Sequence, residues 1–319
     1  RTPSARGDGP PGRAGWLEVA VEVAAIDAEL VADVLRQRCP GGVAVEYPLI
    51  PLADGERYSL DGDGVAVVKA YLPAAPDRSG AGLRSLKLAL PFVPLARPPR
   101  WRRARRLRDE EWQEAWKRYF APTRVGRRLV VKPTWAGYAG GRDDLVIEID
   151  PGMAFGTGQH PTTAMCLRAL EGLVRPQSRV LDLGTGSGIL AIAAARLGAA
   201  PVLALDTDPL AVQAARANVG ANGVEGAVRV EEGTLDKALA AGESFDLIVA
   251  NISGQTILAK VPLLARALTA DGRLLVGGFL EDTVAGLARR LAARGLTVTE
   301  TIAEGDWRSL VARKRAGRA

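Results

Sequence analysis

Three glycines between a strand-like run and a helix-like run give the clearest chemical signal in the sequence. The segment VLDLGTGSGIL (180–190) contains Gly184, Gly186 and Gly188, and Asp182 lies two residues before the first of them. Glycines at such a turn let a ligand approach the backbone at a distance that a Cβ atom would prevent. The segment therefore predicts a nucleoside-binding turn, with a turn that binds no ligand as the alternative.

Two classes of cofactor use a turn of this kind. The dinucleotide pattern G-x-G-x-x-G fails at Ile189 when it is counted from Gly184, but Ala191 satisfies it when it is counted from Gly186. The glycines alone therefore do not exclude NAD. Asp182 completes the arrangement D-x-G-x-G-x-G, which is typical of enzymes that bind S-adenosyl-L-methionine, so we predict that cofactor and no metal site.

An acidic residue ends the next strand-like run. Asp206 closes VLALD (202–206), where a carboxylate can accept hydrogen bonds from both ribose hydroxyls. Asp208 competes for this role, but it precedes Pro209, which suits the first position of a helix. We predict that Asp206 binds ribose and that Asp208 caps the helix.

A glycine-containing loop leads into a helix with hydroxyl side chains in its first turn. The segment DPGMAFGTGQHPTTAMCL (150–167) places Thr162 and Thr163 near the helix start, where free N–H groups favour an anion such as the methionine carboxylate of the cofactor. Plain capping by threonine is the alternative. His160, the only histidine, could accept a proton or shape the loop, and we favour the structural role.

An asparagine ends the fourth strand-like run. In DLIVANISG (246–254), the side-chain carbonyl of Asn251 could accept a hydrogen bond from a target amine and aim its lone pair at a methyl carbon. Such catalysis would act mainly through positioning. The same side chain could instead contact the cofactor or stabilise a turn.

The elements that carry these residues alternate regularly from residue 161 onward. Apolar strand-like runs separated by amphipathic helices indicate a parallel sheet that is covered on both faces, with its ligand beyond the carboxyl ends of the strands. Two further strands are predicted at the end of the chain. The predicted fold is α/β, with a doubly wound, mostly parallel sheet of seven strands: 180–183, 202–206, 227–232, 245–252, 272–278, 296–302 and 307–313.

The preceding half of the chain has a different pattern. Alternating residues at 16–25, an amphipathic segment after Asp27, and two further strand-like runs at 43–50 and 64–72 predict a small α+β domain, of a ferredoxin-like kind. The predicted organisation is a disordered leader (1–15), a substrate-recognition domain (16–95), a linker with a helix at 109–120 (96–125) and a catalytic domain (126–319).

Composition sets limits on the class of protein. No stretch of about 18 uninterrupted apolar residues exists, so we expect no membrane span. The two cysteines, Cys39 and Cys166, argue for a reducing compartment, and a cytoplasmic location is expected. The net charge is +6, and six arginines crowd the run from Arg100 to Arg108. This run could touch RNA or an acidic partner, but a solvated basic linker in an arginine-rich chain is an equal alternative.

Four segments together resemble one family. IDPGMAFGTGQHPTT, VLDLGTGSGILAIAAARLGA, ALDTDPLAVQAARANVGANGV and DLIVANI are similar to the bacterial methyltransferases that modify the large-subunit ribosomal protein L-eleven (PrmA type), and DEEWQEAWKRYFAPTRVGRRLVVKPTW is similar to that family's linker helix and entry strand. The glycine turn is common to most class I methyltransferases, whereas the loop before the Pro-Thr-Thr helix is far more specific. The resemblance covers about residues 109–315 well and residues 1–95 only in outline.

The resemblance implies a site and a reaction. Cofactor contacts would fall on Thr163, Gly184, Asp206 and Asn251, with Asn251 also catalytic, and from the glycine turn we predict Gly186 as a further contact. The reaction would be N-methylation of lysine ε-amines and of an N-terminal α-amine on the ribosomal protein, free or assembled. The N-terminal domain would recognise the substrate, and the linker would reposition the catalytic domain over several amines. We separately expect a monomer.

The chain departs from the family after Asn251. The family usually has Leu and Ala there, whereas this chain has Ile252, Ser253 and Gly254, which we expect to loosen the wall of the amine pocket. Three other functions stay open. They are a lysine methyltransferase for another protein such as an electron-transfer flavoprotein, an RNA methyltransferase, and a cofactor-binding interaction module without activity.

Overall fold

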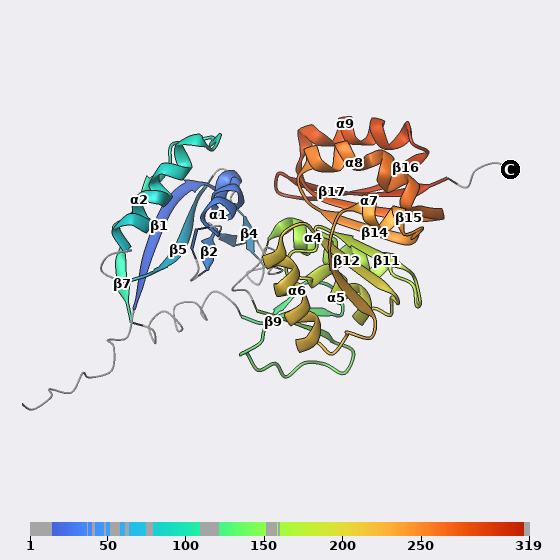
Figure 1. Cartoon of the computed structure of the whole chain (residues 1–319), viewed down its shortest axis with the longest axis horizontal. Helices are drawn as coiled ribbons and strands as arrows, with labels where there is room; N and C mark the ends of the chain where they lie inside the picture. Colours follow the sequence, from blue (N-terminus) through green and yellow to red (C-terminus); the bar gives the residue numbers. More distant parts are fainter. Residues whose placement is uncertain are drawn as a thin grey trace, which may run out of the picture. The chain divides into compact units, whose positions relative to one another are not determined.

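The chain divides into two compact units, residues 1–119 and 120–319. The computed structural model (Figure 1) describes residues 15–36, 38–39, 42–47, 49–51, 58–60, 64–74, 79–108, 121–150, 158 and 160–315. The predicted leader up to residue 14, the predicted helix at 109–120 and the loop glycines Gly152 and Gly156 lie outside these residues. Within them, no helix combines the length and apolar character that crossing a bilayer requires.

The N-terminal unit contains an antiparallel sheet with helices on one face. Its main elements are β1 (Trp16–Ala24), α1 (Ala28–Arg36), β2 (Val43–Glu46), β5 (Val65–Pro73), α2 (Ser79–Ala89) and β6 (Arg100–Trp101), with 3-10 turns at Ala25–Asp27 and Leu90–Phe92. The strand order is β2-β5-β1-β6, and every neighbouring pair is antiparallel. Alternate residues of β1, Val19, Val21 and Val23, share a buried core with Val31 of α1 and Leu86 of α2.

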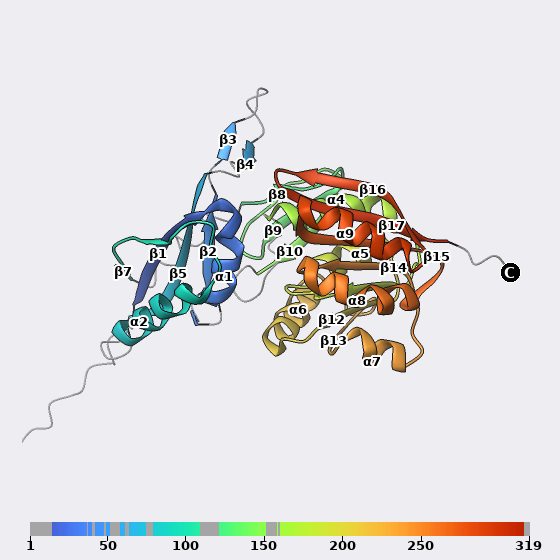
Figure 2. The same ribbon diagram turned by 90° about the horizontal axis from the view of Figure 1, so that it is seen from above.

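Two parts of this unit differ from the sequence-based prediction. The region at 43–64 contains two more short strands, β3 (Leu49–Pro51) and β4 (Tyr58–Leu60), which pair as a hairpin that projects from the sheet (Figure 2). The segment at 76–94, for which the sequence predicted no element, contains α2. Its glycines and serine interrupt the apolar period that predicts a helix.

The predicted linker needs correction. Within 96–125, β6 and β7 (Arg105–Leu107) both pair with β1, so these two strands form an edge of the N-terminal sheet. Arginine and proline suggest a linker by composition, but both are also common on edge strands, where side chains face solvent and charge discourages pairing with another chain.

The C-terminal unit is built on a seven-stranded sheet in the order β13-β12-β11-β14-β15-β17-β16. The first five strands are parallel to their neighbours, and β17 is antiparallel to both β15 and β16. The strands are β11 (Val180–Leu183), β12 (Val202–Asp206), β13 (Val228–Glu232), β14 (Phe245–Asn251), β15 (Leu268–Leu280), β16 (Leu296–Glu304) and β17 (Trp307–Lys314). The helices are α4 (Pro161–Leu173), α5 (Ile189–Arg196), α6 (Pro209–Ala221), α7 (Leu235–Ala240), α8 (Gly254–Ala267) and α9 (Glu281–Ala292). Helix α7 was not predicted.

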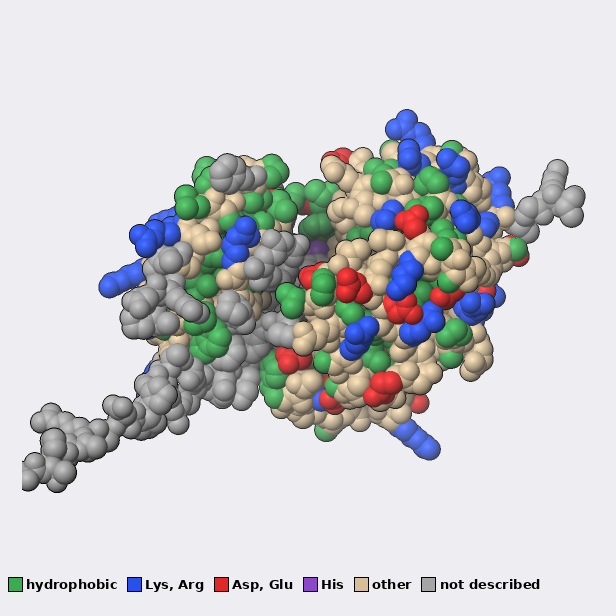
Figure 3. All heavy atoms as spheres, viewed as in Figure 1, with side chains coloured by type: hydrophobic (Ala, Val, Ile, Leu, Met, Phe, Trp, Pro, Cys, Tyr) green, Lys and Arg blue, Asp and Glu red, His purple; other side chains and the backbone are tan. Residues whose placement is uncertain are grey.

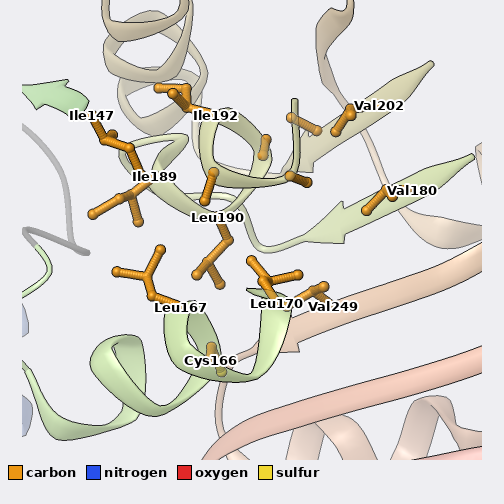
Figure 4. Packing of buried hydrophobic residues seen from close by; sticks show 14 of the residues in the cluster. Ile147, Cys166, Leu167, Leu170, Val180, Ile189, Leu190, Ile192, Val202 and Val249 are labelled. Atoms are coloured by element: carbon orange, nitrogen blue, oxygen red, sulfur yellow. The ribbon is translucent and has the colours of Figure 1, made fainter. Parts of the chain in front are cut away.

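Both faces of this sheet are covered, which explains its uninterrupted apolar strands. On one face, Val180, Val202 and Val249 pack with Leu167 of α4 and Ile192 of α5 (Figure 4). On the other face, the adjacent strand residues pack against α7, α8 and α9, through Leu181, Leu203, Ile248, Leu235, Ile257 and Leu287. The parallel strands therefore end at one edge, where the predicted site residues lie.

A smaller sheet precedes α4. It contains β8 (Thr123–Arg124), β9 (Leu129–Pro133) and β10 (Leu145–Ile149), of which β9 and β10 are parallel. The turn before β9 is fixed to α4 by Glu171, whose carboxylate accepts hydrogen bonds from the backbone N–H groups of residues 127, 128 and 129 at 2.8, 2.7 and 2.9 Å. Burial opposes ionisation of Glu171, but these bonds outweigh it and lower its pKa.

Glu171→Gln should lower the free energy of unfolding by about 1–3 kcal/mol, because the new amide would face N–H groups that need an acceptor. The stabilisation by the carboxylate is present above the pKa of the unfolded chain, about 4.3, and is lost as the pH falls through the lower pKa of the folded chain. Urea unfolding at neutral pH and near pH 3.5 measures this difference. If the difference in free energy of unfolding between the native chain and Glu171→Gln were as large near pH 3.5 as at neutral pH, the assigned role would be contradicted.

Candidate functional site

The predicted site residues lie at the carboxyl ends of neighbouring strands. β11 lies between β12 and β14 in the sheet, so the turn after β11, Asp206 at the end of β12 and Asn251 at the end of β14 come to the same edge. This edge is the position where doubly wound sheets bind ligands.

The glycine turn after β11 is held by the neighbouring strand. The N–H groups of Gly184 and Thr185 both donate to the carbonyl of Leu205, at 2.8 and 3.0 Å. Gly184 has a φ of +74°, and a Cβ there would lie 2.3 Å from Cγ2 of Ile252. Any larger residue would therefore be strained and would also collide with the chain that follows Asn251.

Asp206, at the end of β12, forms a hydrogen bond to the glycine turn. Its Oδ2 accepts a hydrogen bond from the N–H of Gly186 at 2.9 Å, and its Oδ1 accepts one from the N–H of Asp208 at 3.0 Å. Asp208 caps α6 through Leu210, whose N–H donates to Oδ1 at 2.9 Å, which confirms the predicted capping role. Each oxygen of Asp206 keeps a lone pair that a ribose hydroxyl could use.

Asp182 lies beneath this turn and is 1% exposed. Its Oδ2 accepts hydrogen bonds from the Thr185 hydroxyl at 2.7 Å and from the N–H of Ala191 at 3.1 Å, whereas Oδ1 has no partner. Burial raises the pKa of Asp182 to about 6, against the effect of these two bonds, and the negative charge of Asp206 adds to the rise. Asp182 is thus a buried acid that is harder to ionise than a free aspartate.

Asp182→Asn should raise the melting temperature above pH 7. Asparagine can accept both existing bonds through its oxygen, and it carries no charge to bury. Because the folded pKa exceeds the unfolded value, about 3.9, the native acid favours folding most below about pH 4 and less as the pH rises towards 6. Calorimetric scans should therefore show a gain of a few degrees above pH 7, at about 2–4 °C per kcal/mol, that shrinks towards pH 4. If Asp182→Asn raised the melting temperature by the same amount at every pH, the effect would not come from the ionisation of Asp182.

His160 caps the helix that carries the predicted anion-binding hydroxyls. Its Nδ1 accepts a hydrogen bond from the N–H of Thr162 at 3.3 Å and lies 2.7 Å from the Thr162 hydroxyl. The ring is 6% exposed and meets Trp307 edge-on, at 4.8 Å between ring centroids. His160, and not a threonine, is therefore the cap of α4, and Thr162 and Thr163 lie in the first turn behind it.

Asn251 contacts the same helix. Its Nδ2 donates to the hydroxyl of Thr163 at 3.2 Å, so the structure brings two predicted site residues together. Its Oδ1 is buried and has no hydrogen-bond partner. This oxygen could accept a hydrogen bond from a target amine only after the amide rotates about χ2.

Gly277 of β15 leaves room for a polar cluster behind Asn251. A Cβ at Gly277 would lie 2.7 Å from the Ser309 hydroxyl, 3.1 Å from the Cys166 sulfur and 3.2 Å from Oδ1 of Asn251. Burial raises the pKa of the Cys166 thiol to about 12, which makes the thiol unreactive. Ser309, Cys166 and the Asn251 amide therefore lie around the same glycine.

Two asparagines, Asn218 of α6 and Asn222 directly after it, were not identified from the sequence. Asn218 accepts from the N–H of Asp150 at 3.1 Å and donates to the carbonyl of Ser187 at 2.8 Å. Asn222, one turn later, pairs with both backbone groups of Glu148 at 2.9 and 2.7 Å. They join the end of β10 to the glycine turn. Two buried asparagines at a spacing of four residues on an otherwise apolar helix face could have indicated this role.

A protein-family model described as ribosomal protein L11 methyltransferase (PrmA) matches residues 15–315. The chain belongs to this family. The ribosomal protein L11 methyltransferase of Pelotomaculum thermopropionicum is 44% identical over 314 residues, which cover 94% of this chain and 99% of the relative. The same enzyme of Chloroflexus aurantiacus is 41% identical over 323 residues, with 94% and 98% covered.

A solved structure of the family agrees with these matches. The crystal structure of ribosomal protein L11 methylase from Lactobacillus delbrueckii subsp. bulgaricus matches with a TM-score of 0.56 and 32% identity, over 61% of this chain and all of that one. The doubly wound α/β methyltransferase fold predicted from the sequence is thereby confirmed.

The residues that depart from the PrmA pattern after Asn251 have structural roles. Ser253 is exposed and caps α8, with its Oγ accepting from the N–H of Thr256 at 3.3 Å. Gly254 is buried, and a Cβ there would lie 2.8 Å from Cγ2 of Thr283 and 3.0 Å from Cβ of Phe279. Gly254 thus allows close packing of the start of α8 against Phe279 and Thr283, and the expected loosening of the amine pocket stays a prediction.

Proposed function

We propose that the chain is an S-adenosyl-L-methionine-dependent protein N-methyltransferase. Its substrate is ribosomal protein L11, and it methylates lysine ε-amines and the N-terminal α-amine. The family match over residues 15–315 is the observation that carries the substrate, because relatives named for this activity align over nearly their whole length. The meeting of the glycine turn, Asp206 and Asn251 at one edge of the sheet supports the chemistry.

The residues at this edge fit the proposed cofactor. Gly184 and Gly186 are partly exposed and carry no side chain of their own, which leaves backbone against which an adenosine can lie. The lone pairs of Asp206 suit the ribose hydroxyls. Thr163 and Asn251 lie where the first turn of α4 meets the end of β14, a position that suits the methionine part. These five residues remain the proposed cofactor contacts.

When bound, the cofactor supplies a methyl group on a positively charged sulfur. The protein has to present a neutral amine in line with that methyl group. Lysine has a reference pKa near 10.4, so the site must favour its deprotonated form by desolvation. Asn251 is an amide and takes up no proton, so its proposed role is to hold the amine in line while water accepts the proton.

The remaining assignments follow from the same proposal. The N-terminal unit, with its strand–helix–strand repeat and ferredoxin-like strand order, would recognise the ribosomal protein. The segment between the two units would let the catalytic unit address several amines. We propose a monomeric, cytoplasmic enzyme.

Methyl-labelled cofactor and ribosomal proteins from a methylation-deficient strain provide the test. We expect label in L11 alone, and mass spectrometry should locate it on lysine side chains and on the N-terminal amine. Label in ribosomal RNA, or in an electron-transfer flavoprotein offered as a competitor, with none in L11, would refute the proposed substrate.

A further inference from the structure

Positive charge in this chain is concentrated in one stretch of the N-terminal unit. Residues 79–108 contain nine basic side chains and no acidic one: Arg84, Lys87, Arg97, Arg100, Arg102, Arg103, Arg105, Arg106 and Arg108. The whole chain has a net charge of only +6, so all other residues together are net negative. A general preference for arginine would spread the charge along the chain, and it does not explain this concentration.

The fold places most of this charge along one edge of a sheet. β6 and β7 both pair with β1 and form the outer edge of the N-terminal sheet, next to α2 (Figure 1). Lys87 of α2 lies 5.9 Å from the ring centroid of Trp101 on β6, which connects the helix to this edge. Blue side chains of this unit lie over α2 and β7 in Figure 3. We call the side chains of Arg100, Arg102, Arg103, Arg105 and Arg106 the arginine edge.

Only two carboxylates of the described residues neutralise the arginine edge. Glu22 lies 3.8 Å from Arg100 and 2.8 Å from Arg102, and Glu18 lies 3.6 Å from Arg105. The three arginine side chains are 85%, 49% and 64% exposed, so these ion pairs are weak and leave donors directed to solvent.

Two members of the arginine edge have no such partner. Arg103 and Arg106 are exposed, and neither forms an ion pair with any acidic side chain that the structure describes. An anion that binds at either guanidinium therefore competes with no carboxylate of the described residues.

We propose that the arginine edge binds the phosphate backbone of RNA. The planar guanidinium fork pairs with phosphate through two hydrogen bonds, and five of them along one edge suit a polyanion better than a single small anion. Contacts of this kind position a protein on RNA without reading its sequence. The acceptor of the proposed reaction is a ribosomal protein, whose natural surroundings are RNA. The inference does not depend on the chemistry at Asn251, because it concerns binding alone.

The test measures binding of the full chain to a fluorescein-labelled single-stranded RNA of about 20 nucleotides by anisotropy, over a series of salt concentrations. The double variant Arg103→Gln/Arg106→Gln removes the two unpaired charges. We expect its affinity to fall several-fold and the slope of log affinity against log salt to flatten by about 0.7 for each phosphate that the variant no longer binds. The matched control is Arg289→Gln/Arg290→Gln, which removes two exposed charges from α9 in the other unit and should bind RNA like the native chain.

Three results would overturn the proposal: no RNA binding by the native chain, equal weakening in both double variants, or poly-L-glutamate that competes as well as unlabelled RNA at equal charge. The last would assign the edge to an acidic protein. Calorimetry of S-adenosylhomocysteine binding checks that each variant is folded. The anisotropy assay measures RNA binding and involves no methyl transfer. Its outcome can therefore be interpreted even if the chain proves to have no methyltransferase activity.

Discussion

Asn251→Ala is expected to lower kcat by about 100-fold, because misplacing the reacting groups by about 1 Å can cost that much. The native side chain donates a hydrogen bond to the Thr163 hydroxyl, and alanine would remove both this anchor and the oxygen proposed to meet the amine. Stopped assays with methyl-labelled cofactor at saturating acceptor protein measure kcat. Affinity for S-adenosylhomocysteine, measured by calorimetry, should change less than kcat if positioning is the main role.

Ser253→Ala is the matched control for Asn251→Ala. It lies two residues further along and removes the cap of α8, which should cost about 1 kcal/mol in the free energy of unfolding but leave turnover near its native value. Full turnover by Asn251→Ala would refute its proposed role. Equal loss of turnover in both variants would indicate that disturbance of the β14–α8 junction, and not the missing amide, is responsible.

Asp206→Ala should weaken binding of S-adenosyl-L-methionine by at least about 100-fold. Each hydrogen bond to a charged group contributes about 1.5–3 kcal/mol, and every 1.4 kcal/mol is a factor of ten in affinity. The variant loses the proposed bonds from both ribose hydroxyls. It also releases the N–H of Gly186, which helps to hold the glycine turn in its binding conformation. Isothermal titration measures the dissociation constant.

Asp208→Ala separates ligand binding from local folding in that experiment. Asp208 lies in the same short segment but caps α6, and its loss should cost about 1 kcal/mol in stability with little change in cofactor affinity. If the two aspartate variants bound the cofactor equally well, Asp206 would not be the ribose ligand.

The sequence predicted the strands that position the site with good accuracy, because both faces of the sheet are buried. Apolar runs at 180–183 and 202–206 coincide with β11 and β12 residue for residue. The residue types at the ends of these strands were also informative. A glycine-rich turn, followed by an acidic residue at the end of the next strand, is typical of nucleoside-binding sheets. The roles proposed for Thr163, Gly184, Gly186, Asp206 and Asn251 stay predictions until ligand binding is measured.

What the sequence did not predict depends on contacts between distant segments. The α6 asparagines meet β10, about seventy residues earlier, and no local pattern gives that pairing. The edge strands β6 and β7 could not be predicted because exposed arginines dominate their composition and no apolar alternation is present. They are strands because they pair with β1. Capping of α4 by threonine was only the alternative to anion binding, and His160 was expected to shape the loop. Its role as the cap, and the contact of its ring with Trp307, come from the folded structure.

Helix α6 fixes the distance between two parts of the site. Asn218 and Asn222 must both face β10, and Asn218 must also reach the carbonyl of Ser187. Inserting or deleting one residue before Asn218 would turn both amides by about 100° around the helix axis and shift them by about 1.5 Å. Changes in the length of this chain are therefore far less tolerable between Pro209 and Asn222 than in the turns at the opposite edge of the sheet.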